Sequence, residues 1–388
     1  MSFRKVDLSR YSFGGGQSEP IENLSSLDAK DQERLLYAGI DVNQKNVSGT
    51  FMHLNHSGVH CRSWQEGLEI MDIKAALKKY NGLPGQFWEL VDRDKDEYTR
   101  AASENLHGGY FIRAKAGTKI EQPVQSCLFI KGSGLAQNVH NIVVVEEGAE
   151  MHILTGCATA HGTREAAHMG ISEFWVKKGG KLIFTMVHNW GEETAVRPRS
   201  AGVLEEDAVF LNNYVLLKPV TDLQMYPTLS LNGKGAVARF NSVVVAPEGS
   251  YVDTGNRILL NAPETRGEII ARTLTTGGTV INRGHIGASA VPARGHLECK
   301  GLILGGGRIC AIPELDADID GVELSHEAAV GKIAQEEIEY LMARGLDEDE
   351  ATSTIVRGFL NVEMEDLPPE LQASIDKQIN ELNTGSAM

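Results

Sequence analysis

Cysteines are few in this sequence, and they lie far apart. Five occur in 388 residues, and this sparse, odd count excludes a disulfide framework. They are Cys61, Cys127, Cys157, Cys299 and Cys310. No two are close enough to form a Cys-x-x-Cys pair, so neither a zinc ribbon nor a ferredoxin-type cluster motif is present. A metal site in this chain must therefore take its ligands from distant positions.

Long apolar runs and an excess of positive charge are also missing. No stretch approaches the roughly 20 apolar residues that span a bilayer, and the first residues lack the apolar core of a secretory signal. We therefore expect a cytoplasmic protein without a membrane partner. The formal net charge of -15 argues against a nucleic-acid partner, because phosphate neutralisation needs clustered Lys and Arg.

Residues 1–107 are predicted to form a mixed, mainly helical region. Residues 26–39 have a serine cap, early acids and a final glycine, which is typical of a helix. Residues 71–80 and 86–105 predict two more helices, separated by a turn-forming Asn-Gly-Leu-Pro-Gly segment. Residues 50–61 alternate weakly and predict a short pair of strands.

The predicted strand pair contains His53, His56 and His60 beside Cys61. A metal site is one interpretation of this group. Irregularly spaced histidines in a polar strand are more often exposed, and we favour that second interpretation.

From residue 108 onward, short β-branched runs alternate with glycine turns. Two interleaved series of turn positions recur at a nearly constant step: Gly148, Gly179, Asp207 and Gly235, then Gly249, Gly278 and Gly306. A step of about 28 residues indicates a solenoid whose coil contains two main strands and two turns. Amphipathic helices are nearly absent here, so we predict a parallel β-helix over residues 108–320. A two-sheet antiparallel sandwich is the alternative.

Residues 321–388 are predicted to be helical. From 329 to 343 the apolar residues fall near one face, and Gly345 supplies a left-handed stop. Asp347 should cap a second helix, with Glu350 completing a capping box. A last polar helix is expected after the Pro-Pro pair.

Cys299, His326 and Glu327 offer a thiolate, an imidazole and a carboxylate near the predicted end of the β-helix. A soft thiolate together with an imidazole and a carboxylate is a ligand set for iron. Glu298 would point to the opposite face of an extended strand from Cys299 and is a poorer candidate. The alternative is that these residues only pack at, or cap, a strand-to-helix junction.

Several segments resemble the SufB/SufD family of iron–sulfur cluster assembly scaffolds. They are the runs at 293–299 and 326–359 and, upstream, those at 49–57, 155–157 and 188–190. The likeness covers nearly the whole chain, and the minimal archaeal-type version of the system is the nearest form. A polysaccharide lyase, which can also be a β-helix, is disfavoured because such enzymes are typically secreted.

The resemblance implies a right-handed parallel β-helix with a helical region at each end. It also implies two partners: an ABC-type ATPase, SufC, docked on the C-terminal helices, and a second copy that pairs through the β-helix. We expect Ile338, Met342, Ile355 and Phe359 to form the ATPase-docking surface. The chain itself has no Gly-x-x-x-x-Gly-Lys-Ser/Thr loop, so we expect it not to be an enzyme. It would deliver its cluster to apoprotein acceptors.

In the B-type scaffold, the positions that match Cys299 and Glu327 are the leading candidates for holding a transient [2Fe–2S] or [4Fe–4S] cluster. In the D type, glycine is common at the position of Glu327, and a histidine like His326 is important at the subunit interface. This chain has both features, so the resemblance implies a B-type scaffold that works as a homodimer. The alternative is a D-like structural partner that positions the ATPase without holding a cluster.

Cys157 matches the family cysteine proposed to receive sulfur and pass it through the β-helix interior. It is alternatively a cluster ligand, or a small buried hydrophobic residue. Cys127 and Cys310 lie in apolar, strand-like runs, and we predict that both are core residues. The chain is shorter than the usual bacterial B type at its N-terminus, and we expect no flavin because it has no Gly-x-Gly-x-x-Gly motif.

Overall fold

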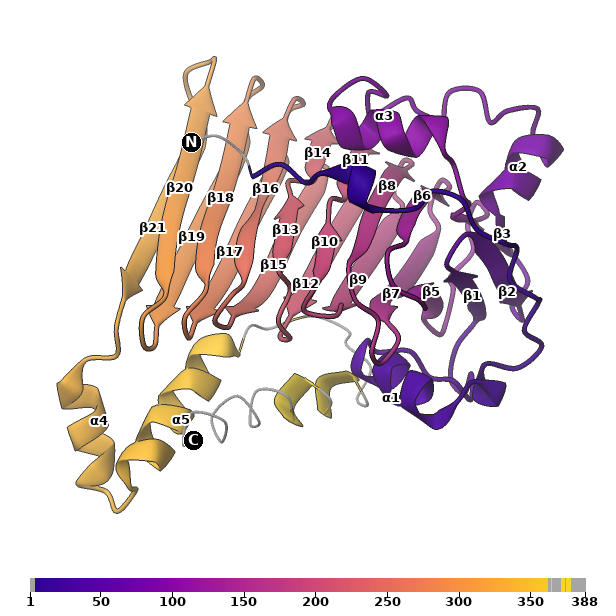
Figure 1. Cartoon of the computed structure of the whole chain (residues 1–388). Coiled ribbons are helices and arrows are strands. Elements are labelled where there is room, and N and C mark those ends of the chain that lie inside the picture. The colour runs from indigo at the N-terminus through magenta and orange to yellow at the C-terminus, as the bar shows by residue number, and fades with distance from the viewer. Residues whose placement is uncertain (1–3, 362–363, 365–370, 374, 378–388) are drawn as a thin grey trace.

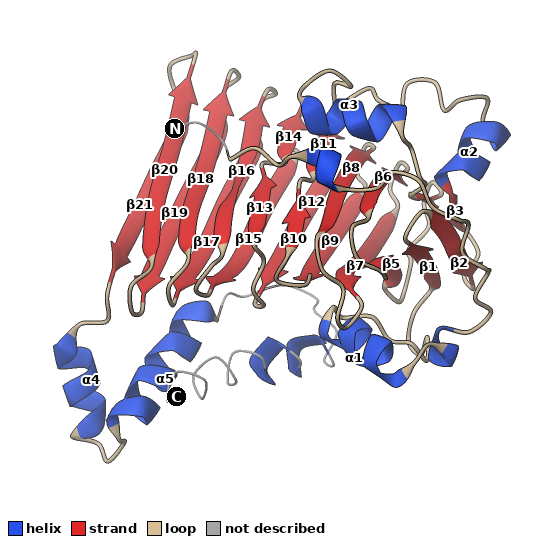
Figure 2. Ribbon diagram, in the orientation of Figure 1, coloured by secondary structure: helices blue, strands red, loops and turns tan. Residues whose placement is uncertain are grey.

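The structure is a computed structural model that describes residues 4–361, 364, 371–373 and 375–377. Two long sheets run along the same axis and face each other across a shared apolar core, and the helices lie at the periphery of this stack (Figures 1 and 2). The first sheet has ten strands and the second has eleven. The described part of the chain is therefore mainly a β-structure, as the sequence predicts.

The strands of the first sheet are, in spatial order, β2 (Ser57–Ser63), β1 (Gly49–Leu54), β5 (Val124–Ile130), β7 (Glu150–Thr159), β9 (Lys181–Asn189), β12 (Val209–Leu216), β15 (Val237–Ala246), β17 (Thr265–Thr275), β19 (Ala293–Ile303) and β21 (Glu323–Gly331). The second sheet contains β3 (Leu68–Asp72), β4 (Tyr110–Ala114), β6 (Ala136–Val145), β8 (Ala166–Val176), β10 (Thr194–Val196), β11 (Arg199–Leu204), β13 (Asp222–Met225), β14 (Thr228–Leu231), β16 (Tyr251–Leu260), β18 (Thr279–Ala288) and β20 (Arg308–Ala317).

Strand pairing confirms the repeat. Lys181 lies beside Val209, and Val209 beside Val237, so successive coils of the first sheet are equally spaced along the chain, and each pairing is parallel. The second sheet advances by the same step where Tyr251 lies beside Thr279. Antiparallel pairs occur only at the start of the described strands, between β1 and β2 and between β3 and β4. This pattern is a parallel β-solenoid and excludes the antiparallel sandwich.

Alternate side chains of each strand point into the solenoid and form its core. Phe184, Phe210 and Phe240 are buried there on successive coils of the first sheet. Leu297 and Cys299 continue the same core into the penultimate coil of that sheet. Burying one such apolar side chain contributes roughly 1.5–3 kcal/mol, so the repeated stack stabilises every coil through its neighbours.

The N-terminal region differs in detail from its prediction. The helix expected at 26–39 is α1 (Ala29–Tyr37), and Asp28 caps it instead of Ser26. The helices expected at 71–80 and 86–105 are α2 (Ile73–Lys79) and α3 (Glu97–Glu104). The short 3₁₀ helices η1 (Leu8–Arg10) and η2 (Leu24–Ser26) precede α1.

Residues 86–96 are not helical, and a buried carboxylate accepts hydrogen bonds from three of their backbone N–H groups. Glu173 accepts hydrogen bonds from the backbone N–H groups of Trp88, Leu90 and Val91 at 2.8, 2.5 and 3.0 Å. These bonds hold the segment on the second sheet in an irregular path. No local signal in the sequence indicates an acceptor that lies so far along the chain.

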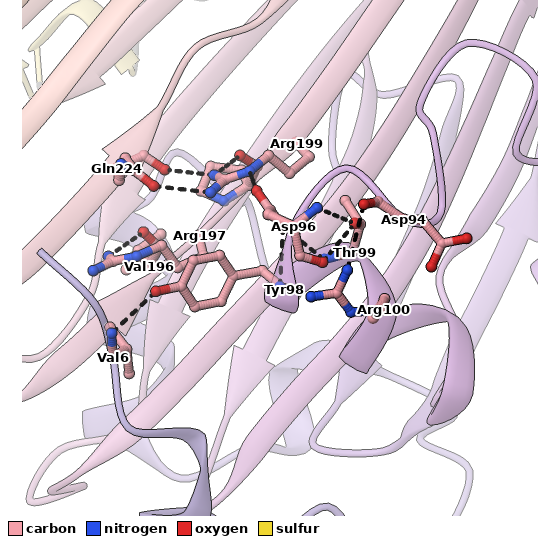
Figure 3. Close-up of polar contacts among 11 residues, drawn as sticks. Val6, Asp94, Asp96, Tyr98, Thr99, Arg100, Val196, Arg197, Arg199 and Gln224 are labelled. Carbon is pink, nitrogen blue, oxygen red and sulfur yellow. Dashed lines mark hydrogen bonds and ion pairs between the residues drawn. The ribbon is translucent and has the colours of Figure 1, made fainter. Parts of the chain in front are cut away.

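Polar contacts attach α3 and the N-terminal segment to the outside of the second sheet (Figure 3). Asp96 caps α3 through the backbone of Tyr98 and Thr99, and its other carboxylate oxygen accepts from Arg199 Nε at 2.6 Å. The hydroxyl of Tyr98 accepts a hydrogen bond from the backbone N–H of Val6 at 3.0 Å. Helix α3 and the N-terminal segment are thus packed onto the solenoid.

The C-terminal region begins later than predicted. Residues 323–331 form β21, the last strand of the first sheet, because their backbone groups pair with β19. Helices follow as α4 (Gln335–Met342) and α5 (Glu348–Leu360). The Asp347 cap and its capping box with Glu350 are confirmed, and Gly345 has a φ of +102° as expected.

Helix α5 covers part of the outer face of the first sheet. Its Val356 and Leu360 pack with Leu371 and Ile375 against an apolar stripe on that face, formed by Leu154, Val187, Val215, Leu217, Val243, Val245, Leu274 and Leu302. None of the helices in the described residues is long and apolar enough to cross a membrane.

Candidate functional site

The last coil of the solenoid is open. In the described part of the chain, β21 pairs only with β19, and β20 pairs only with β18. Large apolar side chains are exposed around it, with Leu315, Ile319 and Val330 at 37%, 41% and 43% exposure. Free sheet edges beside exposed apolar side chains can pair with another chain.

Cys299 lies one strand inside this open end, near the middle of β19. Its side chain is 1% exposed and belongs to the solenoid core. Burial raises the pKa of the Cys299 thiol to about 11, and the nearby Glu298 carboxylate contributes to the same shift. The group is therefore a protonated thiol at neutral pH, and it must lose its proton to bind iron.

The strand register decides which residues accompany Cys299. On β21, His326 lies opposite Leu297, Glu327 opposite Glu298, and Ala328 opposite Cys299. Residues that lie opposite each other on neighbouring strands share a face of the sheet. His326 is therefore on the inner face with Cys299, whereas Glu327 is on the outer face.

The structure thus divides the three ligands expected from the sequence. Cys299 and His326 occupy one face of the sheet, and Glu327 occupies the other. Within one chain, a thiol and a carboxylate on opposite faces do not converge on one ion. Glu298 points away from Cys299, as the alternation of an extended strand predicts.

A second group of donors gathers on the outer face around Glu327. The ligand atoms of His296, Glu298 and Glu327 all lie within 4.8 Å of one another. Lys300 Nζ lies 3.1 Å from Glu298 and 3.0 Å from Glu327. Arg272 also forms an ion pair with Glu298.

Our sequence interpretation missed His296 and set Glu298 aside. The length of the repeat could have predicted this group. A residue one coil further along the chain lies beside its counterpart on the neighbouring strand, and Glu327 follows Glu298 by one coil. Alternation along the strand then adds His296, two positions before Glu298, to the same face.

Cys157 is on the inner face of β7, far inside the solenoid. It is 1% exposed and packs in a cluster that includes Leu128, Trp190 and Tyr214. Burial raises the pKa of the Cys157 thiol well above its ordinary value. The interior is partly polar here, since the Tyr214 hydroxyl and His188 Nδ1 are hydrogen bonded at 3.0 Å. Burial lowers the pKa of His188 to about 3, so this imidazole is neutral.

The other cysteines match their predictions in part. Cys127 is a fully buried core residue, as predicted. Cys310 is only half-buried, as are its neighbours Ile309 and Ala311, because β20 is the last strand of the second sheet. Cys310 alternates with these inward-facing residues and so lies on the outer face of β20.

The histidines near the N-terminus are less exposed than we predicted. His53 is fully buried, and His60 is buried with hydrogen bonds to the Ile21 carbonyl and to Gln44. Packing of η2 and the following segment against β1 and β2 covers His60. His53 lies on the other, inner face of β1, where its ring is close to Gly108.

The four residues expected to dock the ATPase do not form one exposed surface. Met342 is exposed on α4, but Ile338 is only 9% exposed. Ile355 and Phe359 of α5 are half-buried, and Phe359 contacts the apolar stripe on the first sheet. The accessible part of this group is therefore centred on Met342, with Tyr340 exposed nearby.

Comparison with known proteins identifies a family that matches most of this chain. Residues 128–359 match the family model described as the SufBD core domain of the SUF system for FeS cluster assembly. A SufBD family protein of Archaeoglobus fulgidus is 49% identical over 350 residues, which are 90% of this chain and 94% of the relative.

Two further similar proteins also have names that refer to iron–sulfur cluster assembly. A SufBD family protein of Methanothermobacter thermautotrophicus is 40% identical over 97% of this chain and 93% of its own length. The iron–sulfur cluster assembly protein SufB of Bacillus subtilis is 30% identical over 81% of this chain and 68% of its own length. The solenoid, the Cys299 segment and these matches together show that the chain belongs to the SufBD family of iron–sulfur cluster assembly proteins.

Proposed function

We propose that this chain is a B-type scaffold, on which an iron–sulfur cluster is built and from which it is released. The observation that supports this most directly is the position of Cys299, a buried thiol one strand away from the open end of the solenoid. His326 shares its face on the terminal strand. A soft thiolate combined with few other strong ligands suits a cluster that must leave again.

The proposed working form is a homodimer. The free edges of β20 and β21 and their exposed apolar residues favour pairing with a second copy at this end. In such a dimer, Cys299 and His326 of one chain would lie near the corresponding residues of its partner. Ligands that do not converge within one chain, Glu327 among them, would then be available at the junction.

Cys157 is proposed to relay sulfur to Cys299 through the interior. Both thiols point into the solenoid, and polar groups such as His188 and Tyr214 accompany Cys157. In this transfer the Cys157 thiolate would attack the outer, sulfane sulfur of a donor persulfide, the sulfur–sulfur bond of the donor would break, and the donor thiolate would leave. Because the thiol is buried and protonated, the proposal includes a local opening that admits the sulfur donor.

The cluster itself is tested by anaerobic reconstitution of the wild-type protein, together with the proposed SufC-like ATPase, using ferrous and ferric iron salts and sulfide. A B-type scaffold should retain a cluster after desalting, with a visible absorption band and with iron and sulfide in stoichiometric amounts. A complex that retains neither would support the D-like alternative, in which the chain only positions the ATPase.

A SufC-like ATPase is the proposed partner of the C-terminal helices. We expect the Met342→Glu and Ile355→Glu pair to abolish co-purification with this ATPase, because a buried charge without a partner is costly in an interface. Met342 is exposed and Ile355 half-buried, so the solenoid should stay folded.

The matched control places the same two charges at exposed apolar residues elsewhere, Leu36→Glu and Trp64→Glu. This control should bind the ATPase normally. Full binding by the Met342 and Ile355 variant, with an unchanged circular dichroism spectrum, would rule out this docking surface.

A further inference from the structure

The outer face of the penultimate and last coils carries a donor set that combines Glu327 with two residues, His296 and Glu298, to which the proposed cluster site assigns no role. His296 and Glu298 belong to β19, and Glu327 belongs to β21. Their ligand atoms lie within 4.8 Å of one another. One imidazole and two carboxylates are a set that divalent first-row metals such as Fe²⁺ accept.

The polar partners of this group leave a ligand atom available. His296 Nδ1 and Ser325 Oγ are hydrogen bonded at 2.8 Å, which fixes the ring and leaves Nε2 for a metal ion. A hydrogen bond to the second nitrogen of an imidazole is the usual support of a metal-binding histidine.

A cation already lies between the two carboxylates. Lys300 Nζ is 3.1 Å from Glu298 Oε2 and 3.0 Å from Glu327 Oε1. Two carboxylates opposite each other on adjacent strands repel, and the ammonium offsets that repulsion. The lysine side chain is flexible and 29% exposed, so it can leave when a stronger cation arrives.

Ion pairs alone would be a simpler explanation of this face. Arg239 pairs with Glu268, Arg272 with Glu298, and Lys300 with Glu327, which is a ladder that follows the coil step. A purely structural ladder explains the lysine and the two carboxylates. It does not explain why His296, held by Ser325, is directed into the same group.

We infer that His296, Glu298 and Glu327 form a loading site for one Fe²⁺ ion, and that Lys300 occupies this site until the ion binds. The inference rests on the proposed scaffold function. Glu298 immediately precedes Cys299 in the strand, so iron and sulfur would approach neighbouring residues from opposite faces of one sheet. Keeping them on separate faces prevents iron and sulfide from combining before the cluster is assembled.

Anaerobic calorimetric titration of Fe²⁺ into the sulfide-free protein tests this site. We expect one Fe²⁺ per chain. His296→Ala and Glu327→Gln should each weaken binding by about tenfold or more, since even losing an outer partner of a metal ligand costs 10–100-fold. Lys300→Met should strengthen binding, because it removes the competing ammonium. Glu205→Gln, at an ion pair with Lys177 several coils away, is the matched control and should bind as the wild type does.

Fe²⁺ binding at this site can be tested separately from cluster assembly. Cys299→Ser should bind Fe²⁺ normally even though it lacks the cluster thiol. Absence of saturable Fe²⁺ binding, unchanged binding in His296→Ala, or loss of binding in Cys299→Ser would each overturn the loading site. If the wild type nevertheless forms a cluster with iron and sulfide, the scaffold function stands without it.

Discussion

Replacing Cys299 by serine should leave the protein folded but unable to retain an iron–sulfur cluster. Serine is nearly the same size, so the core around Leu297 keeps its packing, at a cost of about 1–3 kcal/mol for burying a hydroxyl. A hydroxyl is a poor ligand for the iron of a cluster, which requires a thiolate. Cluster content after anaerobic reconstitution and desalting should fall by about tenfold or more.

Cys310→Ser is the matched control for this experiment. Cys310 lies on the other sheet, on the outer face of β20, and we assign it no role in the cluster. Its variant should bind as much iron and sulfide as the wild type. A Cys299→Ser protein that also loads fully would remove Cys299 from the ligand set, and with it the main support for the B-type assignment.

Replacing Glu173 by alanine should have the largest effect on stability. Its carboxylate is buried and accepts hydrogen bonds from three backbone N–H groups and from His140 Nε2 at 2.7 Å. His140 in turn packs against the rings of Phe87 and Trp88. Its removal leaves three backbone N–H groups and His140 without their acceptor, and each unsatisfied buried donor costs about 1–3 kcal/mol, so we expect a loss of at least about 3 kcal/mol in the free energy of unfolding, measured by chemical denaturation.

The same pair predicts how stability changes with pH. Burial would raise the pKa of Glu173, but the hydrogen bonds from His140, Leu90 and Val91 outweigh it and hold the pKa below its ordinary value. Burial lowers the pKa of His140, and Glu173 offsets this only in part. Both groups bind protons more readily when unfolded. Stability should therefore fall below about pH 6.5 through His140 and further below about pH 4.3 through Glu173.

Glu206→Ala provides the control for stability. Its carboxylate pairs with Lys178 at 3.0 Å, and both side chains are about half exposed. Such surface pairs contribute about 0–1 kcal/mol, so this variant should be nearly as stable as the wild type. A Glu173→Ala protein with a similarly small loss, or one with an unchanged acid transition, would show that the buried pair does not hold the 86–91 segment in place.

The sequence by itself determined the repeating part of the molecule. Turns at a nearly constant step, with β-branched runs between them, specify a solenoid, because each coil must place the same kind of side chain at the same position to stack on the next. Local signals also specified the cap of α5 at Asp347 and the stop at Gly345. The same alternation correctly placed Glu298 on the face opposite Cys299.

Contacts between residues far apart in the sequence determined the features that the sequence did not predict. Residues 323–331 read as the approach to a helix, but pairing with β19 makes them a strand. Residues 86–96 read as helical, but Glu173 binds their backbone. Only the register of β21 against β19 separates Glu327 from Cys299 and brings it to His296. Alternation along a strand determines which of its side chains share a face. The residues that lie opposite them on the next strand depend on the register, which is fixed only when the whole sheet is formed.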